Sequence, residues 1–201
     1  MAMKVHAQIF SALMVFAIAF SGSNVVAKTE LGPKVGEKIP VDFSSIRDRQ
    51  GNKMTLEDLT AENGAAIFFV RSVDWCPFCK QQAIDVDRRA ADFEDRGIKP
   101  IFVSYDTQAK QTDFAQRENF SLTLLSDERS EVIKEFGLLN ESHVPASRFY
   151  GIPHPAIFIV GTDGIIKAKL YEQDYATNAK SYRNRPAVDI VLDKIDEVLA
   201  P

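Results

Sequence analysis

The chain has two cysteines, Cys76 and Cys79, which stand three positions apart in the segment SVDWCPFCKQQ. They follow an apolar run typical of a buried strand, residues 65–70, and they open a pattern typical of an amphipathic helix. The first turn of a helix presents unpaired N–H groups and the positive end of the helix dipole, and both favour a thiolate. The position and spacing therefore predict a redox-active pair that alternates between dithiol and disulfide.

The two sulfurs are expected to have different roles. Cys76 stands on the loop before the helix, so we expect its sulfur to be accessible and to attack a partner. Cys79 lies inside the first helical turn, so we expect it to be more covered and to act as the resolving thiol. The neighbouring Trp75 is expected to pack over the pair as a hydrophobic lid, with an ordinary core position as the alternative.

Other interpretations of the pair stay open. A purely structural disulfide would close a very small loop and would stabilise the chain little. A zinc site needs four ligands, and beyond the N-terminal segment the chain offers only His143 and His154 besides the cysteines. A binding module that uses the pair as a staple is the remaining alternative. We expect no metal and no cofactor.

The elements that must position the pair follow an alternating pattern of strands and helices. Three continuous apolar runs, residues 65–70, 101–105 and 155–160, have the composition of central parallel strands that are covered on both faces. Between and after them, apolar residues recur at helical spacing, as in Ala83, Val86, Ala90 and Phe93. The turn at residues 161–164 and the alternating strand after it predict an antiparallel hairpin near one edge. The order predicts an α/β fold with helices around the sheet.

The N-terminus has the features of a signal peptide. Lys4 precedes an apolar run over residues 9–20, and small residues lead to Ala27. The run is shorter than the ~20 residues that span a bilayer. We therefore predict cleavage after Ala27, a single domain over residues 28–201, and export to an oxidising compartment such as the bacterial periplasm.

The charge pattern limits the partners. The chain carries a net charge of −4 at pH 7 and has no polybasic block. Nucleic acid is therefore not expected as a partner, and neither is stable membrane insertion once the leader is removed.

The motif WCPFC and the strand order resemble the thioredoxin superfamily. In GIPHPAIFIV, Pro155 opens a buried strand, like the cis-proline that faces the active-site pair in thioredoxin-like folds. The resemblance implies a cis bond between His154 and Pro155, with Pro153 as the rival position. It also implies that His154 contacts a docking partner chain. The His154 ring either tunes Cys76 or is only a solvated loop histidine.

More narrowly, the chain resembles the redoxin branch, the alkyl hydroperoxide reductase/thiol-specific antioxidant (peroxiredoxin-like) family. Residues 35–59 are similar to the opening of that family, and residues 122–138 are similar to its insertion. The active-site pattern departs from the family in either register of the cysteines. The position of the family's peroxide-binding arginine holds Pro155, and nothing in the sequence places Arg71 or Arg148 there instead.

These observations lead first to an exported thiol–disulfide oxidoreductase that exchanges its Cys76–Cys79 disulfide with protein thiols. A peroxiredoxin-like thiol peroxidase, which reduces hydroperoxides with a thiol reductant, is the alternative. A non-catalytic thioredoxin-fold module is the second alternative. The direction of electron flow depends on the reduction potential of the pair.

Overall fold

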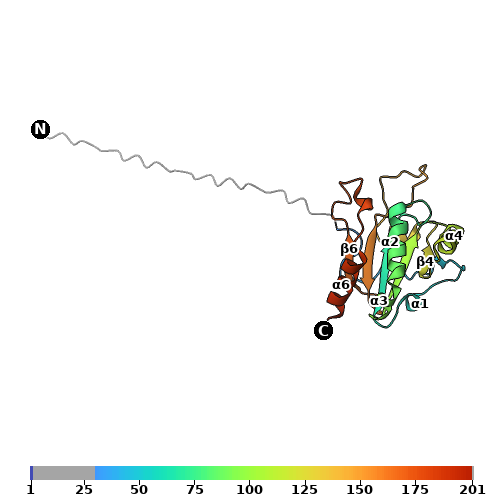
Figure 1. The fold of residues 1–201 in the computed structure, drawn as a ribbon. Helices are drawn as coiled ribbons and strands as arrows, with labels where there is room; N and C mark the ends of the chain where they lie inside the picture. The colour runs from blue at the N-terminus through green and yellow to red at the C-terminus, as the bar shows by residue number, and fades with distance from the viewer. Residues whose placement is uncertain (2–29, 201) are drawn as a thin grey trace.

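The computed structural model describes Met1 and residues 30–200 (Figure 1). The leader predicted over residues 1–27 and its cleavage site lie outside the described residues, except for Met1. Within the described part, none of the helices combines the length and the apolar character needed to cross a bilayer.

Six strands form one mixed sheet in the order β1-β4-β3-β2-β5-β6. In chain order they are β1 (Arg47–Asp48), β2 (Gly64–Phe69), β3 (Ile98–Ser104), β4 (Thr123–Ser126), β5 (Ala156–Val160) and β6 (Ile166–Tyr171). Strands β2, β3 and β4 run parallel, while β1, β5 and β6 each run antiparallel to their neighbours. The predicted antiparallel hairpin is thus confirmed as β5–β6.

The direction of β5 differs from the prediction of a third parallel strand. Its first residue, Ala156, pairs with Phe69 at the carboxyl end of β2, and Val160 pairs with Ala65. A parallel strand needs a crossover that returns the chain to the other end of the sheet. The loop over residues 138–155 instead enters β5 from the carboxyl end of β2. Because β5 is buried on both faces, its continuous apolar run could not distinguish the two directions.

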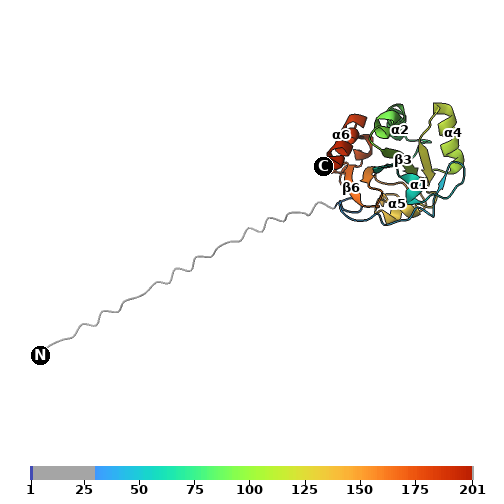
Figure 2. The ribbon, with the colours of Figure 1, turned by 90° about the horizontal axis from the view of Figure 1, so that it is seen from below.

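Helices cover both faces of the sheet, as Figure 2 shows. One face packs against α2 (Pro77–Arg88), α3 (Ala90–Glu94), α4 (Gln108–Glu118) and α6 (Val188–Leu199). The other packs against α1 (Leu56–Leu59), α5 (Glu131–Glu135) and the N-terminal segment from residue 31 to 46. Alternate residues of β2 enter the two cores, with Ala66 and Phe68 on the first face and Ile67 and Phe69 on the second. The predicted α/β, thioredoxin-like architecture is confirmed.

The helix predicted after the cysteine pair is divided in two. The backbone of Arg89 leaves the helical region, at φ −108° and ψ 19°, and its N–H group bonds the carbonyl of Val86 at 3.0 Å. This turn is tighter than an α-helix. It redirects the chain into α3, whose Phe93 is fully buried beside Phe68, with ring centroids 6.4 Å apart.

The insertion predicted from residues 122–138 forms β4 and α5. Helix α5 ends at Glu135, and Gly137, just beyond the C-cap residue Phe136, has a φ of +65°, in the left-handed region that glycine tolerates best. Gly64, at the start of β2, has φ +126°, and a side-chain carbon there would collide with the carbonyl oxygen of Val160. The close approach of β2 to β5 therefore depends on this glycine.

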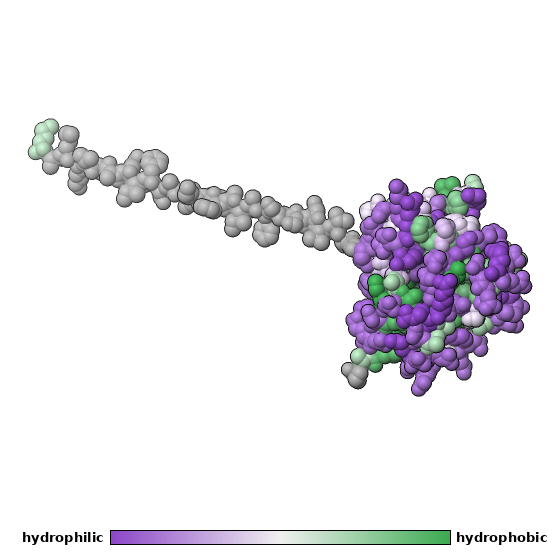
Figure 3. Space-filling view, in the orientation of Figure 1, coloured by the Kyte–Doolittle hydropathy of each residue, from purple (hydrophilic) through white to green (hydrophobic). Residues whose placement is uncertain are grey.

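The outer surface is mostly hydrophilic on the face drawn in Figure 3, with small scattered apolar patches. This agrees with the 26% of charged residues in the chain and with a core whose largest fully buried side chains are phenylalanines.

Candidate active site

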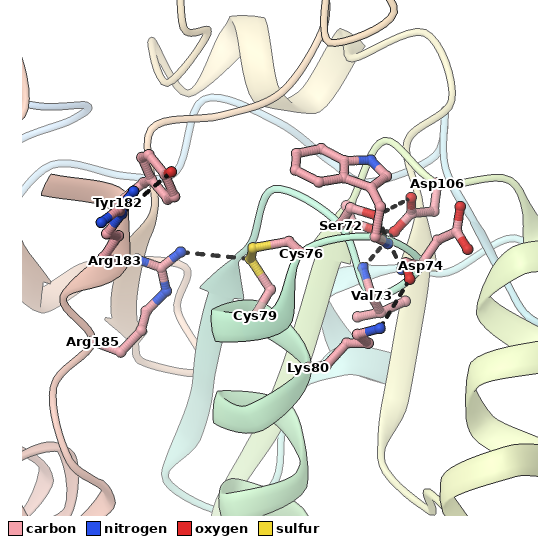
Figure 4. Close-up of a disulfide and its surroundings, with 12 residues drawn as sticks. Ser72, Val73, Asp74, Cys76, Cys79, Lys80, Asp106, Tyr182, Arg183 and Arg185 are labelled. Atoms are coloured by element: carbon pink, nitrogen blue, oxygen red, sulfur yellow. Dashed lines mark hydrogen bonds between the residues drawn. A yellow bond between two sulfur atoms is a disulfide. The ribbon is translucent and has the colours of Figure 1, made fainter. Parts of the chain in front are cut away.

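The cysteine pair lies at the N-terminus of α2, directly after the carboxyl end of β2 (Figure 4). Cys76 is the N-cap residue with an extended backbone, and its carbonyl accepts a hydrogen bond from the N–H group of Lys80 at 3.0 Å. Pro77 occupies the first helical position, where a missing N–H group costs no hydrogen bond. Cys76 and Cys79 form a disulfide with their Cα atoms 5.3 Å apart.

Both cysteines are buried, so the expectation of an accessible Cys76 sulfur is wrong for the disulfide form. Cys76 is 1% exposed and Cys79 is fully buried, and both belong to the core cluster on the α2 face of the sheet. The reason is the disulfide, which ties the Cys76 side chain inward to the first turn of α2. The two spacer residues face solvent instead: Pro77 is exposed, and Phe78 is 37% exposed.

A buried carboxylate holds the loop that leads into the pair. Asp106 follows β3 and accepts hydrogen bonds from the Ser72 hydroxyl at 2.7 Å, the Val73 N–H group at 2.7 Å and the Ser104 hydroxyl at 2.8 Å. Burial raises the pKa of Asp106, and these hydrogen bonds oppose that rise. The Ser72 oxygen in turn accepts from the N–H group of Trp75 at 3.2 Å. The carboxylate thus fixes the backbone before Cys76, as Figure 4 shows.

Trp75, which precedes the pair, has an intermediate exposure. Its side chain is half-buried and packs against the core cluster that contains both cysteines. The indole N–H group donates to the Tyr105 hydroxyl at 3.0 Å. The ring contacts Phe149, with centroids 4.8 Å apart, and the Arg71 guanidinium lies 5.0 Å from the ring centre.

Arg185 contacts the disulfide and is a residue that the sequence did not indicate. Its Nη2 atom lies 3.5 Å from Sγ of Cys79, and its Nη1 atom donates to the Asn184 carbonyl at 2.8 Å. Its Nε atom is buried without a hydrogen-bond partner among the described residues. Burial, together with the nearby Arg71, lowers the pKa of Arg185 to about 10, so it remains a cation at neutral pH. Only its place in a polar, irregular segment, residues 171–186, distinguished it in the sequence.

The peptide bond between His154 and Pro155 is trans, as are all other bonds that the structure describes. The predicted cis-proline, at Pro155 or at Pro153, is therefore wrong. The local pairing accounts for the extended chain, because the His154 N–H group donates to the Leu138 carbonyl at 2.7 Å and Pro153 forms a bridge with Leu139. A trans bond is the lower-energy form for most X–Pro pairs.

His154 is partly buried, and its ring packs against the edge of Tyr175 with centroids 4.8 Å apart. Burial, His143 and Arg71 together lower the pKa of His154 to about 4. The ring is therefore neutral at pH 7 and is not an ordinary solvated loop histidine. Pro155 lines a small cavity of about 20 Å³ together with Arg185 and Gln82.

A much larger cavity, of about 810 Å³, lies between the loops over residues 137–155 and 175–182. Arg71, His143, His154, Pro155 and Tyr182 line it, whereas Trp75 and the two cysteines do not. The structure thus brings His154, Pro155 and Arg71 to one cavity. The cysteine pair is buried beside that cavity. Arg148 instead lies on the exposed side of Phe149, 4.5 Å from the ring centre.

No group of three or more His, Cys, Asp or Glu side chains in the described residues is arranged to hold a metal ion. Asp74, two positions before Cys76, forms an ion pair with Lys110 at 2.9 Å.

Comparison with known proteins identifies relatives of this arrangement. The AhpC/TSA family matches residues 35–169. Peroxiredoxin Bcp of Escherichia coli K12 is 28% identical over 123 residues, which cover 61% of this chain and 77% of that protein. Peroxiredoxin bcp1 of Schizosaccharomyces pombe is 31% identical over 104 residues, which cover 52% of each protein.

Solved structures share the fold. Peroxidoxin BcpB from Mycobacterium tuberculosis aligns with a TM-score of 0.68 and 21% identity, covering 83% of this chain and 99% of that one. A peroxiredoxin-like protein from Aquifex aeolicus aligns with a TM-score of 0.64 and 22% identity, covering 84% of this chain and 91% of that one. Because the family match spans well over half of the sequence, the chain belongs to the AhpC/TSA family.

Proposed function

We propose that this protein is a thiol-dependent peroxidase that reduces hydroperoxides through Cys76 and Cys79. Membership of the AhpC/TSA family supports a thiol-dependent oxidoreductase, and the relatives named above are peroxiredoxins. The observation that carries the proposal is the contact of the Arg185 guanidinium with Sγ of Cys79. Since the family's arginine position holds Pro155, Arg185 supplies a cation to the pair from another part of the chain.

The contact favours Cys79 as the attacking thiolate, in place of the Cys76 expected from the sequence. In the reduced protein the Cys79 thiolate attacks one peroxide oxygen, the O–O bond breaks, and the leaving alkoxide takes a proton to become an alcohol. Cys79 is then a sulfenic acid. The Cys76 thiol displaces its hydroxyl as water and closes the disulfide. Two equivalents of an external thiol restore the dithiol and leave as a disulfide.

Burial of both sulfurs favours a small substrate over a folded protein. A hydroperoxide requires only a narrow opening beside Phe78, whereas a protein disulfide would have to displace the first turn of α2 to reach either sulfur. Trp75 precedes Cys76 in the chain and Phe78 precedes Cys79.

The test uses the reduced protein and hydrogen peroxide in a stopped-flow instrument. Trp75 is the single tryptophan of the chain and precedes Cys76, so its fluorescence is expected to report oxidation. We expect Cys76→Ser to react once and to accumulate a sulfenic acid that dimedone labels, whereas Cys79→Ser does not react.

Two outcomes would count against this scheme. If only Cys79→Ser accumulates the labelled sulfenic acid, the attack belongs to Cys76. A rate no faster than that of free cysteine for the unmodified protein would remove the peroxidase function.

Thiol–disulfide exchange with protein thiols is the second candidate. The Cys-x-x-Cys spacing at the start of α2, with the disulfide formed, supports it. Rapid reduction of insulin disulfides, together with slow peroxide consumption, would select it. Export to the periplasm also stays a proposal, which rests on residues 1–27. Sequencing the N-terminus of the mature protein tests the predicted cleavage, which would leave Lys28 as the first residue.

A further inference from the structure

The large cavity beside the cysteine pair contains a buried arginine. Arg71 directly follows Val70 at the carboxyl end of β2, is 8% exposed and lines the cavity of about 810 Å³. This volume lies in the range of small-molecule binding sites. The walls come from loops far apart in the sequence, residues 137–143 and 175–182, with His154 and Pro155 between them.

The charge of Arg71 has no acidic partner among the residues that the structure describes. In the described part of the chain, no Asp or Glu forms an ion pair with it, and its Nε atom is buried without a hydrogen-bond partner. A buried charge without a counter-ion is costly. Burial accordingly lowers the pKa of Arg71, while Tyr182 opposes the shift.

Two aromatic rings hold the guanidinium in place. Its central carbon lies 3.9 Å from the ring centre of Tyr182 and 5.0 Å from that of Trp75. Contacts with ring faces leave the N–H edge of a guanidinium available, and this edge matches the two oxygens of a carboxylate.

The other polar groups of the cavity suit an anion. Among the described residues that line it, Glu141 is the single acidic one, and it is exposed. The other polar side chains of the lining are donors or neutral groups, among them Lys134, Asn140, Ser142, His143 and His154. His143 and His154 both have lowered pKa values, chiefly because of burial and with a contribution from Arg71, so they are neutral hydrogen-bonding groups at pH 7.

The cavity also adjoins the reacting pair. The Tyr182 ring lines the cavity and packs against Phe78, the residue before Cys79, with centroids 6.0 Å apart. On the other side of Arg71, Trp75 is the residue before Cys76. A ligand bound at Arg71 would therefore lie close to Trp75 and Phe78, the aromatic residues that precede the two cysteines.

We propose that this cavity binds the carboxylate group of a small organic reactant, with Arg71 as its anchor. The carboxylate belongs either to the hydroperoxide or to the thiol that reduces the disulfide. The role as a reactant rests on the proposed peroxidase function, whereas carboxylate binding does not.

The binding test is calorimetric titration of the oxidised protein with sodium benzoate and with benzamide, its uncharged counterpart. We expect benzoate to bind at least tenfold more tightly than benzamide, and Arg71→Gln to weaken benzoate at least tenfold. Arg71→Lys keeps the charge without the planar fork and is expected to weaken binding severalfold. The matched control is Arg148→Gln, which removes an exposed arginine outside the cavity and is expected to leave binding unchanged.

Equal binding of benzoate and benzamide overturns the proposal, as does an equal loss in the Arg71 and Arg148 variants. If Arg71→Gln fails to fold, as judged by circular dichroism, the comparison of Arg71→Lys with Arg148→Gln decides in the same way.

Turnover then identifies the source of the carboxylate. With dithiothreitol as reductant, kcat/KM for linoleate hydroperoxide is compared with that for cumene hydroperoxide, which has no carboxylate. With cumene hydroperoxide as substrate, thioglycolate is compared with 2-mercaptoethanol. If the protein prefers the carboxylate-bearing hydroperoxide or the carboxylate-bearing thiol, and Arg71→Lys reduces that preference, the site is assigned to that reactant.

The absence of a preference in both comparisons overturns the role as a reactant site. A protein that binds benzoate through Arg71 but consumes no peroxide refutes the peroxidase function and leaves the carboxylate site standing.

Discussion

Replacing Arg185 by methionine removes the guanidinium that lies 3.5 Å from Sγ of Cys79. In the disulfide form this cation faces a sulfur with no net charge, whereas in the reduced form it faces a thiolate. The cost of burying Arg185 is similar in the two redox states and cancels in the reduction potential. The substitution is therefore expected to destabilise the reduced form selectively.

The size of the effect follows from the contact. A hydrogen bond to a charged group contributes about 1.5–3 kcal/mol. Because 1.4 kcal/mol corresponds to about 30 mV for a two-electron couple, the potential of the pair should fall by about 30–60 mV. The same loss lowers the thiolate fraction of Cys79, so the reaction with hydrogen peroxide at pH 7 should slow about tenfold or more.

The potential is measured by equilibrating the protein in dithiothreitol redox buffers at pH 7 and alkylating the free thiols. Arg183→Met is the matched control, since it removes an exposed arginine two positions away that does not contact the sulfur. Arg185→Lys keeps the charge and should recover part of the loss. A potential for Arg185→Met within about 10 mV of the unmodified protein, or an equal shift in Arg183→Met, would refute the role of this contact.

Three further substitutions test the architecture around the site. Asp106→Ala should lower the free energy of unfolding in urea by about 3–9 kcal/mol, since three buried donors lose their acceptor at about 1–3 kcal/mol each, and Ser72→Ala should cost less. His154 has a folded pKa of about 4 against 6.5 when unfolded, so the unfolded chain binds more protons between these values and stability falls as the pH is lowered from 6.5 to 4. His154→Gln should abolish up to roughly 3 kcal/mol of that fall, and equal pH slopes for the two proteins would contradict it. Gly64→Ala should cost about 3 kcal/mol or more because strain at φ +126° adds to a collision with β5, whereas Gly51→Ala, at φ +87° with free space around it, should cost only about 1 kcal/mol.

Local patterns in the sequence were sufficient for the frame of the fold. The apolar runs of β2, β3 and β5 predicted buried strands, and the helical spacing after Cys79 predicted α2. These features depend on neighbouring residues, whose periodicity sets which face is buried. The direction of β5 was missed because a strand buried on both faces reads alike in both directions.

The sequence by itself also located the disulfide, because Cys76 and Cys79 at the start of a helix need only local geometry to form it. Tertiary structure alone decided the surroundings of the pair. Arg185 contacts Cys79, which lies 106 positions away in the chain. The cavity beside Arg71 is formed by loops that are distant from it in sequence. The hydrophobic periodicity of the sequence cannot predict such contacts, because they arise where separate loops converge at the carboxyl end of β2. The packing of those loops sets the burial, charge and space that the sulfurs experience.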